Sequence, residues 1–232
     1  MLNSQKNVLV SLISTILFVF SASCNADWFT SAEVKELINH ADAGDVNAQL
    51  RVGLAYDEGN GAPKSRDKAM KYYLMAAEQG MAEAQNSVGS MLQAEKKYDE
   101  ARSWYEKAAA QNHSTAINNL AYFHDLGLGV PQDRQKGFEL YSRSADLGNA
   151  EAMWNIANMY GAGQLGKIDL VNTCVWTVRA QRHGSASPRL TAHTNRVLPW
   201  LRDKLSIPEW SICQQEGTSW SPQGNTQAKA TE

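Results

Sequence analysis

The sequence lacks the apolar–polar alternation that marks a half-buried β-strand, and no segment of it sustains that pattern. It also lacks an excess of charge of one sign, because 22 Lys and Arg stand against 24 Asp and Glu. The resulting net charge of −2 gives no electrostatic reason to expect nucleic acid or an anionic membrane as a partner. The missing alternation predicts an all-α protein without a sheet. The 43% of hydrophobic residues supply an ordinary packed core.

Common signatures of catalysis and metal binding are missing as well. Gly-x-Ser-x-Gly, Cys-x-x-Cys and His-Glu-x-x-His do not occur, and the five histidines show no metal-like spacing. Ser65 and Lys68 fit Ser-x-x-Lys, the nucleophile motif of β-lactam-processing enzymes, but the companion Ser-Asp-Asn and Lys-Thr-Gly motifs are absent. We therefore expect Ser65 to cap a helix, and we expect no catalytic residues, no metal and no cofactor.

The longest charge-free apolar run, residues 8–20, is too short to span a bilayer, which takes about 20 residues. Preceded by Lys6 and followed by small residues, it is typical of a signal peptide over residues 1–26, cleaved after Ala26. An uncleaved anchor or a lipid on Cys24 are the alternatives. The pattern predicts a periplasmic or secreted protein without a transmembrane helix in the mature chain.

Cysteine is scarce, with three in the chain. Cys24 lies in the leader or at its edge, so the mature chain keeps Cys174 and Cys213. An even pair in an oxidising compartment favours one disulfide between them. Two buried free thiols are the alternative.

A repeat runs through the rest of the chain. Helix-ending residues recur at intervals of 36, 32, 36 and 36, namely Gly44, Gly80, Asn112, Gly148 and Gly184. Gly and Asn can adopt the left-handed conformation that closes a helix, so we expect each to be a C-terminal cap. The same spacing predicts that each repeat is one supersecondary unit.

A second series keeps the same phase and divides each repeat into two helices, A and B. It consists of Ala48, Ala84, Ala116 and Ala152, each followed five residues later by a small residue that lets two helices approach closely. In the first repeat helix A covers about residues 47–57, a Gly-rich turn reverses the chain, and helix B covers about 66–79. Trp104 and Trp176 occupy the helix B position of Tyr72, so we expect them to pack in the core.

The predicted organisation places capping elements on both sides of the repeats. The second of the C-terminal capping helices opens with a capping box at Ser206 and Glu209, and the first is expected to break near Pro199. The segments are a signal peptide at 1–26, an N-terminal capping helix at 27–46, repeats at 47–80, 81–112, 113–148 and 149–184, capping helices at 185–216 and a disordered tail at 217–232.

Taken together, the in-phase residues resemble the Sel-one-like repeat family, a relative of the tetratricopeptide repeat. The resemblance covers roughly residues 31–184 and is carried in the first repeat by Ala48, Gly53, Tyr56, Gly59, Gly61, Pro63, Ala69, Tyr72, Ala76, Ala77 and Gly80. It implies an α/α superhelical solenoid that acts as an adaptor for protein complexes, often in bacterial envelopes. It names no partner.

By analogy with tetratricopeptide grooves, the A helices should line a concave binding surface. The positions not used for packing include four acids and no Lys or Arg, which disfavours capture of a C-terminal carboxylate. They are Asn47, Leu50, Leu54, Asp57, Glu83, Asn86, Ser90, Gln93, Thr115, Asn118, Tyr122, Asp125, Glu151, Trp154 and Asn158.

Within this surface Asn86, Asn118 and Asn158 could hydrogen-bond an extended peptide, and Tyr122 and Trp154 could anchor a partner. A merely solvated face is the alternative. The expected function is therefore a periplasmic or secreted scaffold that binds a protein or peptide and is not an enzyme. A hydrolase or binding protein acting on β-lactams or cell-wall material is the second hypothesis.

Overall fold

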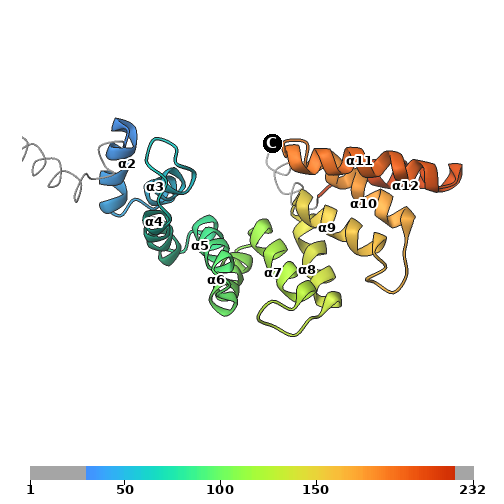
Figure 1. Cartoon of the computed structure of the whole chain (residues 1–232), viewed down its shortest axis with the longest axis horizontal. Helices are drawn as coiled ribbons and strands as arrows, with labels where there is room; N and C mark the ends of the chain where they lie inside the picture. The colour runs from blue at the N-terminus through green and yellow to red at the C-terminus, as the bar shows by residue number, and fades with distance from the viewer. Residues whose placement is uncertain (1–29, 223–232) are drawn as a thin grey trace, which may run out of the picture. The chain divides into compact units, whose positions relative to one another are not determined.

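The computed structural model describes residues 30–222, which form eleven helices and no strand (Figure 1). The all-α fold class predicted from the sequence is confirmed for this part of the chain, whereas the predicted signal peptide lies outside it. The helices are α2 (Ala32–Asp42), α3 (Val46–Glu58), α4 (Arg66–Glu78), α5 (Ala82–Ala94), α6 (Tyr98–Ala110), α7 (Ser114–Leu126), α8 (Arg134–Asp146), α9 (Ala150–Gly161), α10 (Leu170–His183), α11 (Pro188–Lys204) and α12 (Ile207–Ser219).

The described residues divide into two compact units, residues 30–76 and residues 77–222, with the boundary inside α4. None of the helices in residues 30–222 is both long and apolar enough to cross a membrane.

In the first unit α2 is joined to the turn between α3 and α4. Ser31 begins α2, and its Oγ accepts a hydrogen bond from the Val34 N–H at 3.2 Å. The Ser31 N–H donates to the Gly61 carbonyl at 2.7 Å. A Cβ on Gly61 would lie 2.9 Å from both Ser31 Oγ and Val34 Cγ2, so the turn requires glycine to come this close to α2.

All five predicted cap residues lie at the end of a helix, and the left-handed conformation expected of them is confirmed at four. Gly44, Gly80, Asn112 and Gly148 have φ values of 100°, 93°, 59° and 87°, all in the left-handed region. Gly184 is the exception, because its φ is −102°. A Cβ on Gly184 would fall on the Leu190 side chain and 3.0 Å from Ala150 Cβ, so close packing is the reason for glycine there.

Small residues on helix A receive an aromatic ring from helix B of the same pair. A Cβ on Gly53 would lie 2.5 Å from the Tyr73 ring, and one on Gly89 would lie 2.7 Å from the Tyr105 ring. Tyr73, Tyr105 and Tyr141 recur at the same position of α4, α6 and α8 and are at most 1% exposed. The expected close approach of the two helices is confirmed, and these rings fill the core between them.

The prediction that Trp104 and Trp176 pack in the core is confirmed in part, because Trp176 packs against a core cluster but both side chains are only partly buried. The residue after each is the fully buried one, Tyr105 in α6 and Thr177 in α10, both 0% exposed. Trp104 is half-buried, with the Lys107 ammonium 3.7 Å from its ring centroid. A helix turns by about 100° per residue, so a one-residue shift moves a side chain from the core to its edge.

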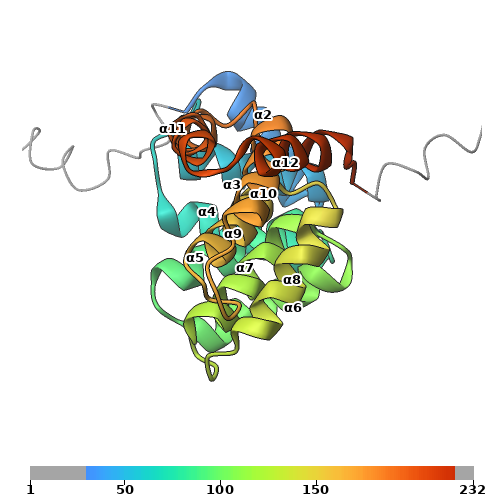
Figure 2. The ribbon, with the colours of Figure 1, turned by 90° about the vertical axis from the view of Figure 1, so that its right-hand side faces the viewer.

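The predicted break of α11 at Pro199 is also wrong, because the helix continues from Pro188 to Lys204. Leu190, Thr194 and Leu201 lie on its buried side both before and after the proline. Packing of the two halves on one side of the helix outweighs the single backbone hydrogen bond that proline removes. Figure 2 shows α10 with α11 and α12 on either side of it.

The structure moves the start of the predicted tail beyond Gly217. Helix α12 continues to Ser219, and Gly217 is buried against α10, where a Cβ would lie 2.7 Å from Val178. Trp220 then packs beside Trp176, with ring centroids 6.2 Å apart. Apolar contact therefore orders the chain through Trp220 despite its polar composition, and residues 223–232 of the predicted tail lie outside the described residues.

Candidate functional site

In the second unit, α5, α7 and α9 are the first helices of successive repeats and carry most of the predicted binding residues. Hydrogen bonds between side chains link these helices. We call the linked surface the A-face and define it by Glu83, Asn86, Asn118, Asn119, Tyr122, Glu151, Trp154 and Asn155. All eight are at least partly exposed to solvent.

Two asparagine pairs hold the A-face in register. Asn119 Nδ2 donates to Asn86 Oδ1 at 3.1 Å, and Asn155 Nδ2 donates to Asn118 Oδ1 at 3.0 Å. Each pair joins the A helix of one repeat to that of the next. Since an amide carries two N–H donors and an oxygen acceptor, each pair retains hydrogen-bonding capacity of both kinds.

The A-face continues onto α11 through an aromatic contact and an ion pair. The Trp154 and His193 rings lie 5.7 Å apart, and Arg189 forms a 2.9 Å salt bridge with Glu151. Arg189 is exposed, so this bridge adds little stability, but it places a cation beside a predicted acidic position. The expectation of a face without cations therefore fails at α11.

A histidine lies at the start of α7 beside the A-face. His113 Nδ1 accepts a hydrogen bond from the Ala116 N–H at 3.3 Å and so caps the helix. Partial burial lowers the pKa of His113, and the negative charge of Glu83 opposes this shift. The neutral ring is the form that can accept this bond, so capping and burial favour the same protonation state.

Asp125 does not belong to the binding surface and is a correction to the sequence-based set. It is 9% exposed, because α8 approaches α7 closely at Gly137, where a Cβ would lie 3.2 Å from Asp125 Cβ. Burial raises the pKa of the Asp125 carboxyl, and Arg134, with its Nε 3.9 Å away, partly offsets the shift. The carboxylate is part of the α7–α8 contact.

Other predicted residues are used within or between repeats. The Tyr105 hydroxyl lies 2.7 Å from Gln93 Oε1 and 3.2 Å from Ser90 Oγ. Ser90 and Gln93 therefore join α5 to α6 of the same repeat. Asn149 Nδ2 donates to Thr115 Oγ1 at 3.5 Å. Asn158 is exposed on α9.

In the first unit the four predicted residues all lie on α3. Asn47 is exposed, whereas Leu50, Leu54 and Asp57 are half-buried. Arg51 lies on the same helix and forms a 3.5 Å salt bridge with Glu33. This cation was also missing from the sequence-based set.

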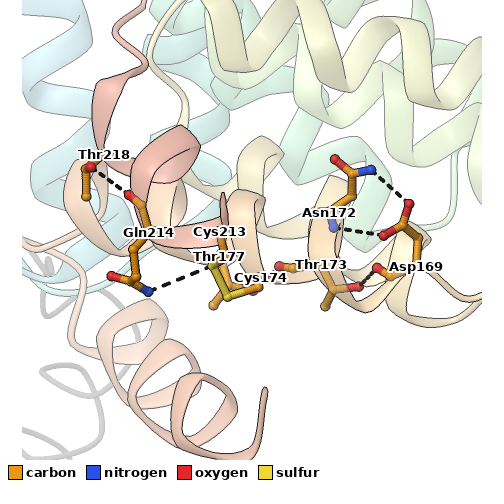
Figure 3. The surroundings of a disulfide bond; sticks show 8 residues. All are labelled: Asp169, Asn172, Thr173, Cys174, Thr177, Cys213, Gln214 and Thr218. Carbon is orange, nitrogen blue, oxygen red and sulfur yellow. Dashed lines mark hydrogen bonds between the residues drawn. A yellow bond between two sulfur atoms is a disulfide. The ribbon is translucent and has the colours of Figure 1, made fainter. Parts of the chain in front are cut away.

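The predicted disulfide is confirmed. Cys174 of α10 and Cys213 of α12 are bonded, with a Cα–Cα distance of 5.6 Å, and both are 0% exposed (Figure 3). Val175, Val178 and Leu201 surround the bond. The bridge attaches the terminal helix to the last repeat.

Among residues 30–222, no three His, Cys, Asp or Glu side chains gather as metal ligands would. Ser65 Oγ accepts a hydrogen bond from the Lys68 N–H at 3.4 Å, as expected of a residue that begins a helix.

Asn119 and Asn155 are A-face residues that sequence reasoning missed. Repeat alignment compares equivalent positions of the repeats. Each hydrogen-bonded pair instead joins a residue to the one that directly follows its equivalent in the next repeat. A comparison offset by one residue would have matched Asn86 with Asn119 and Asn118 with Asn155. His193 and Arg189 were missed because α11 was treated as a cap.

The fold and the linked A helices define a protein built from helix-pair repeats, an α-solenoid. Four segments match the Sel1 repeat, at residues 46–81, 82–113, 114–149 and 150–171. They cover more than half of the chain, and the protein therefore belongs to the Sel1 repeat family.

Similar proteins agree with this assignment. An uncharacterised protein of Neisseria meningitidis serogroup B is 46% identical over 155 residues, which is 66% of this chain and 32% of that protein. The chain thus spans about a third of that relative. A Sel1 repeat protein from Oxalobacter formigenes has a TM-score of 0.63 at 29% identity, covering 71% of this chain and 65% of that one.

A third similarity concerns the fold alone. The protective antigen c5321 of uropathogenic Escherichia coli, described as displaying an SLR fold, has a TM-score of 0.72 at 22% identity. The match covers 86% of this chain and 43% of that one.

Proposed function

We propose that this protein is an exported scaffold that binds a protein partner in extended conformation along the A-face. A Sel1-repeat fold is typical of protein–protein interaction, and that coarser assignment follows from the family match. The observation that supports the finer proposal is the pair of interhelical asparagine contacts, Asn86–Asn119 and Asn118–Asn155.

The asparagines are suited to an extended backbone because they supply donors and acceptors at a regular interval. Their mutual hydrogen bonds hold the amides in place before binding, which reduces the entropy cost of ordering them. Tyr122, 39% exposed, and half-buried Trp154 flank the amides and offer aromatic anchors.

Export is supported by two separate features. Residues 1–26 have the pattern of a signal peptide, and the Cys174–Cys213 disulfide suits an oxidising compartment. A periplasmic or secreted location is therefore part of the proposal.

Site-specific photo-crosslinking in the producing cell tests the A-face. A benzoylphenylalanine at Tyr122 should form an adduct with a single partner, identified by mass spectrometry, whereas the same group at exposed Glu139 on α8 should not. Replacing Asn86 and Asn118 by Ala should reduce the adduct at least about fivefold, since each lost hydrogen bond contributes about 0.5–1.5 kcal/mol. Equal adducts from both positions would contradict the proposal.

A further inference from the structure

The first unit contains a cleft between α2 and α4, and none of its lining residues belongs to the A-face. Its volume is about 460 Å³, within the range of ligand sites in proteins. Side chains from both helices and from α3 line it: Thr30, Lys35, Ile38, Asn39, Tyr56, Lys68, Lys71 and Tyr72.

Positive charge dominates the lining of this cleft. Lys35 projects from α2, and Lys68 and Lys71 from α4, whereas no Asp or Glu occurs among the described residues that line it. The nearby Asp42 accepts a hydrogen bond from the Tyr72 hydroxyl at 3.2 Å, which engages that carboxylate. The cleft therefore favours an anion.

The ammonium groups of Lys68 and Lys71 lie over two stacked tyrosine rings. The Tyr56 and Tyr72 centroids are 6.1 Å apart, with Lys68 Nζ 5.0 Å from the first and Lys71 Nζ 4.9 Å from the second. The rings are 2% and 5% exposed, so they form a floor under the ammonium groups and are not a stacking surface for a ligand. Cation–π contacts of this kind hold lysine side chains in place.

A polar side chain in the same cleft has an unmet hydrogen bond. Thr30 is 6% exposed, and its Oγ1 is buried without a hydrogen-bond partner. Buried hydroxyls are usually paired, because leaving one unpaired costs free energy. Thr30 also lines the cleft, so a ligand oxygen that displaces the atoms covering the hydroxyl would satisfy it.

The other repeats show that the fold does not require these lysines. The positions of Lys68 and Lys71 are occupied in α6 by Glu100 and Ser103, and in α8 by Lys136 and Glu139. Helices α6 and α8 form in the same way with these residues. The basic cluster is therefore a feature of the first repeat that packing does not explain.

We propose that this cleft binds an acidic segment of a protein partner, with two or more neighbouring carboxylates on the lysines and one carboxylate oxygen on Thr30 Oγ1. The three ammonium groups come from two helices and can each pair with a separate carboxylate, and the Sel1 repeats favour a polypeptide as the carrier of these carboxylates. This site extends the function beyond the A-face and does not depend on it.

Fluorescence anisotropy with a labelled peptide of four Glu–Gly units tests the proposal on the mature chain. We expect saturable binding whose affinity falls when the salt concentration is raised from about 50 to about 300 mM, because salt screens exposed charges. Lys35→Glu with Lys71→Glu should weaken binding at least about tenfold. Thr30→Val, which keeps the side-chain shape, should weaken it about three- to tenfold without lowering the melting temperature.

The matched control is Lys107→Glu with Lys204→Glu, which changes the net charge equally but lies on α6 and α11. This pair, and the A-face variant Asn86→Ala with Asn118→Ala, should bind the peptide as the wild type does, so that failure here is separable from failure at the A-face. The proposal would be overturned if the control pair lost as much peptide affinity as the cleft variant. It would also be overturned if the cleft variant or Thr30→Val bound the peptide unchanged, or if binding to the wild type did not saturate. Lysine-dependent binding of anionic vesicles or pyrophosphate in place of the peptide would do so as well.

Discussion

At the scale of single residues, glycine serves two physical purposes in this protein. Gly80 has φ of 93° and open space around its Cα, so only its backbone conformation requires glycine. Gly184 has an ordinary φ of −102° but no room for a Cβ. The repeat pattern treats both positions alike, although they would respond differently to substitution.

Gly80→Val should be destabilising, because a β-branched residue in the left-handed region costs more than the roughly 1–2 kcal/mol of an ordinary L-residue. Urea unfolding followed by far-UV circular dichroism measures the loss. The matched control is Gly80→Asn, since asparagine holds the same conformation at Asn112 with φ of 59° and should cost less. Equal stability of the Val variant and the wild type would mean that the cap does not restrain the helix.

His113 should make the stability of the second unit depend on pH. Burial lowers its pKa in the folded state below the usual value of about 6.5, so the stabilising contribution is fully present above that value and is lost as pH falls through the folded pKa. His113→Asn keeps a capping side chain, as Asn149 does at the start of α9, and removes the titration. We expect a flatter stability profile between pH 7 and 5 for this variant, measured by urea unfolding. A slope like that of the wild type would assign the dependence to another group, such as His183, whose pKa burial also lowers.

At the scale of elements, the C-terminal end is held by contacts that no repeat pattern describes. Helices α11 and α12 both pack on α10, and Arg179 of α10 lies 4.5 Å from the Trp176 ring and 5.2 Å from the Trp220 ring. The disulfide is buried in a second cluster, with Val175, Val178 and Leu201. A terminal repeat lacks the neighbour that stabilises internal ones, and this packing takes the neighbour's place.

Reducing the Cys174–Cys213 bond should destabilise this end first. Closing a loop of 39 residues contributes about 3–4 kcal/mol in the chain-entropy model. Hydrogen exchange after reduction should therefore rise over residues 187–215 before it rises in α5 and α7. The Cys174→Ala and Cys213→Ala double variant should behave like the reduced protein. Two reactive thiols in unfolded, non-reduced mature chain would exclude the bond.

At the scale of the whole molecule, the protein has two surfaces that we propose as binding sites. The A-face and the lysine cleft lie in different units, with different chemistry: paired amides in one and ammonium groups in the other. We propose both as sites that recognise another polypeptide.

Export is the prediction that concerns residues 1–26. Cleavage after Ala26 should leave Asp27 as the first residue of the mature protein, because small residues follow the apolar segment at 8–20. N-terminal sequencing of protein from the cell envelope or medium measures this. An intact Met1 on cytoplasmic protein would contradict it, and a lipid-modified Cys24 would favour the lipidated alternative.

The sequence by itself determined the repeats, the helix pairs and most of the caps, because these depend on local backbone preferences that recur at a fixed spacing. Gly44, Gly80 and Gly148 each end a helix through their own left-handed conformation. The capping box at Ser206 and Glu209 likewise forms within four residues. The disulfide could also be inferred, since the two cysteines that remain after the predicted cleavage have one possible partner each.

The tertiary structure alone decided which side chains meet across repeats. Asn86 pairs with Asn119 and Asp125 is buried, because the distance between neighbouring helices, and not the spacing along the chain, sets these contacts. The same reason explains the unbroken α11, the ordered Trp220 and the convergence of Lys35 and Lys71 in one cleft. Contacts between residues far apart in sequence are fixed by packing, which no local pattern encodes.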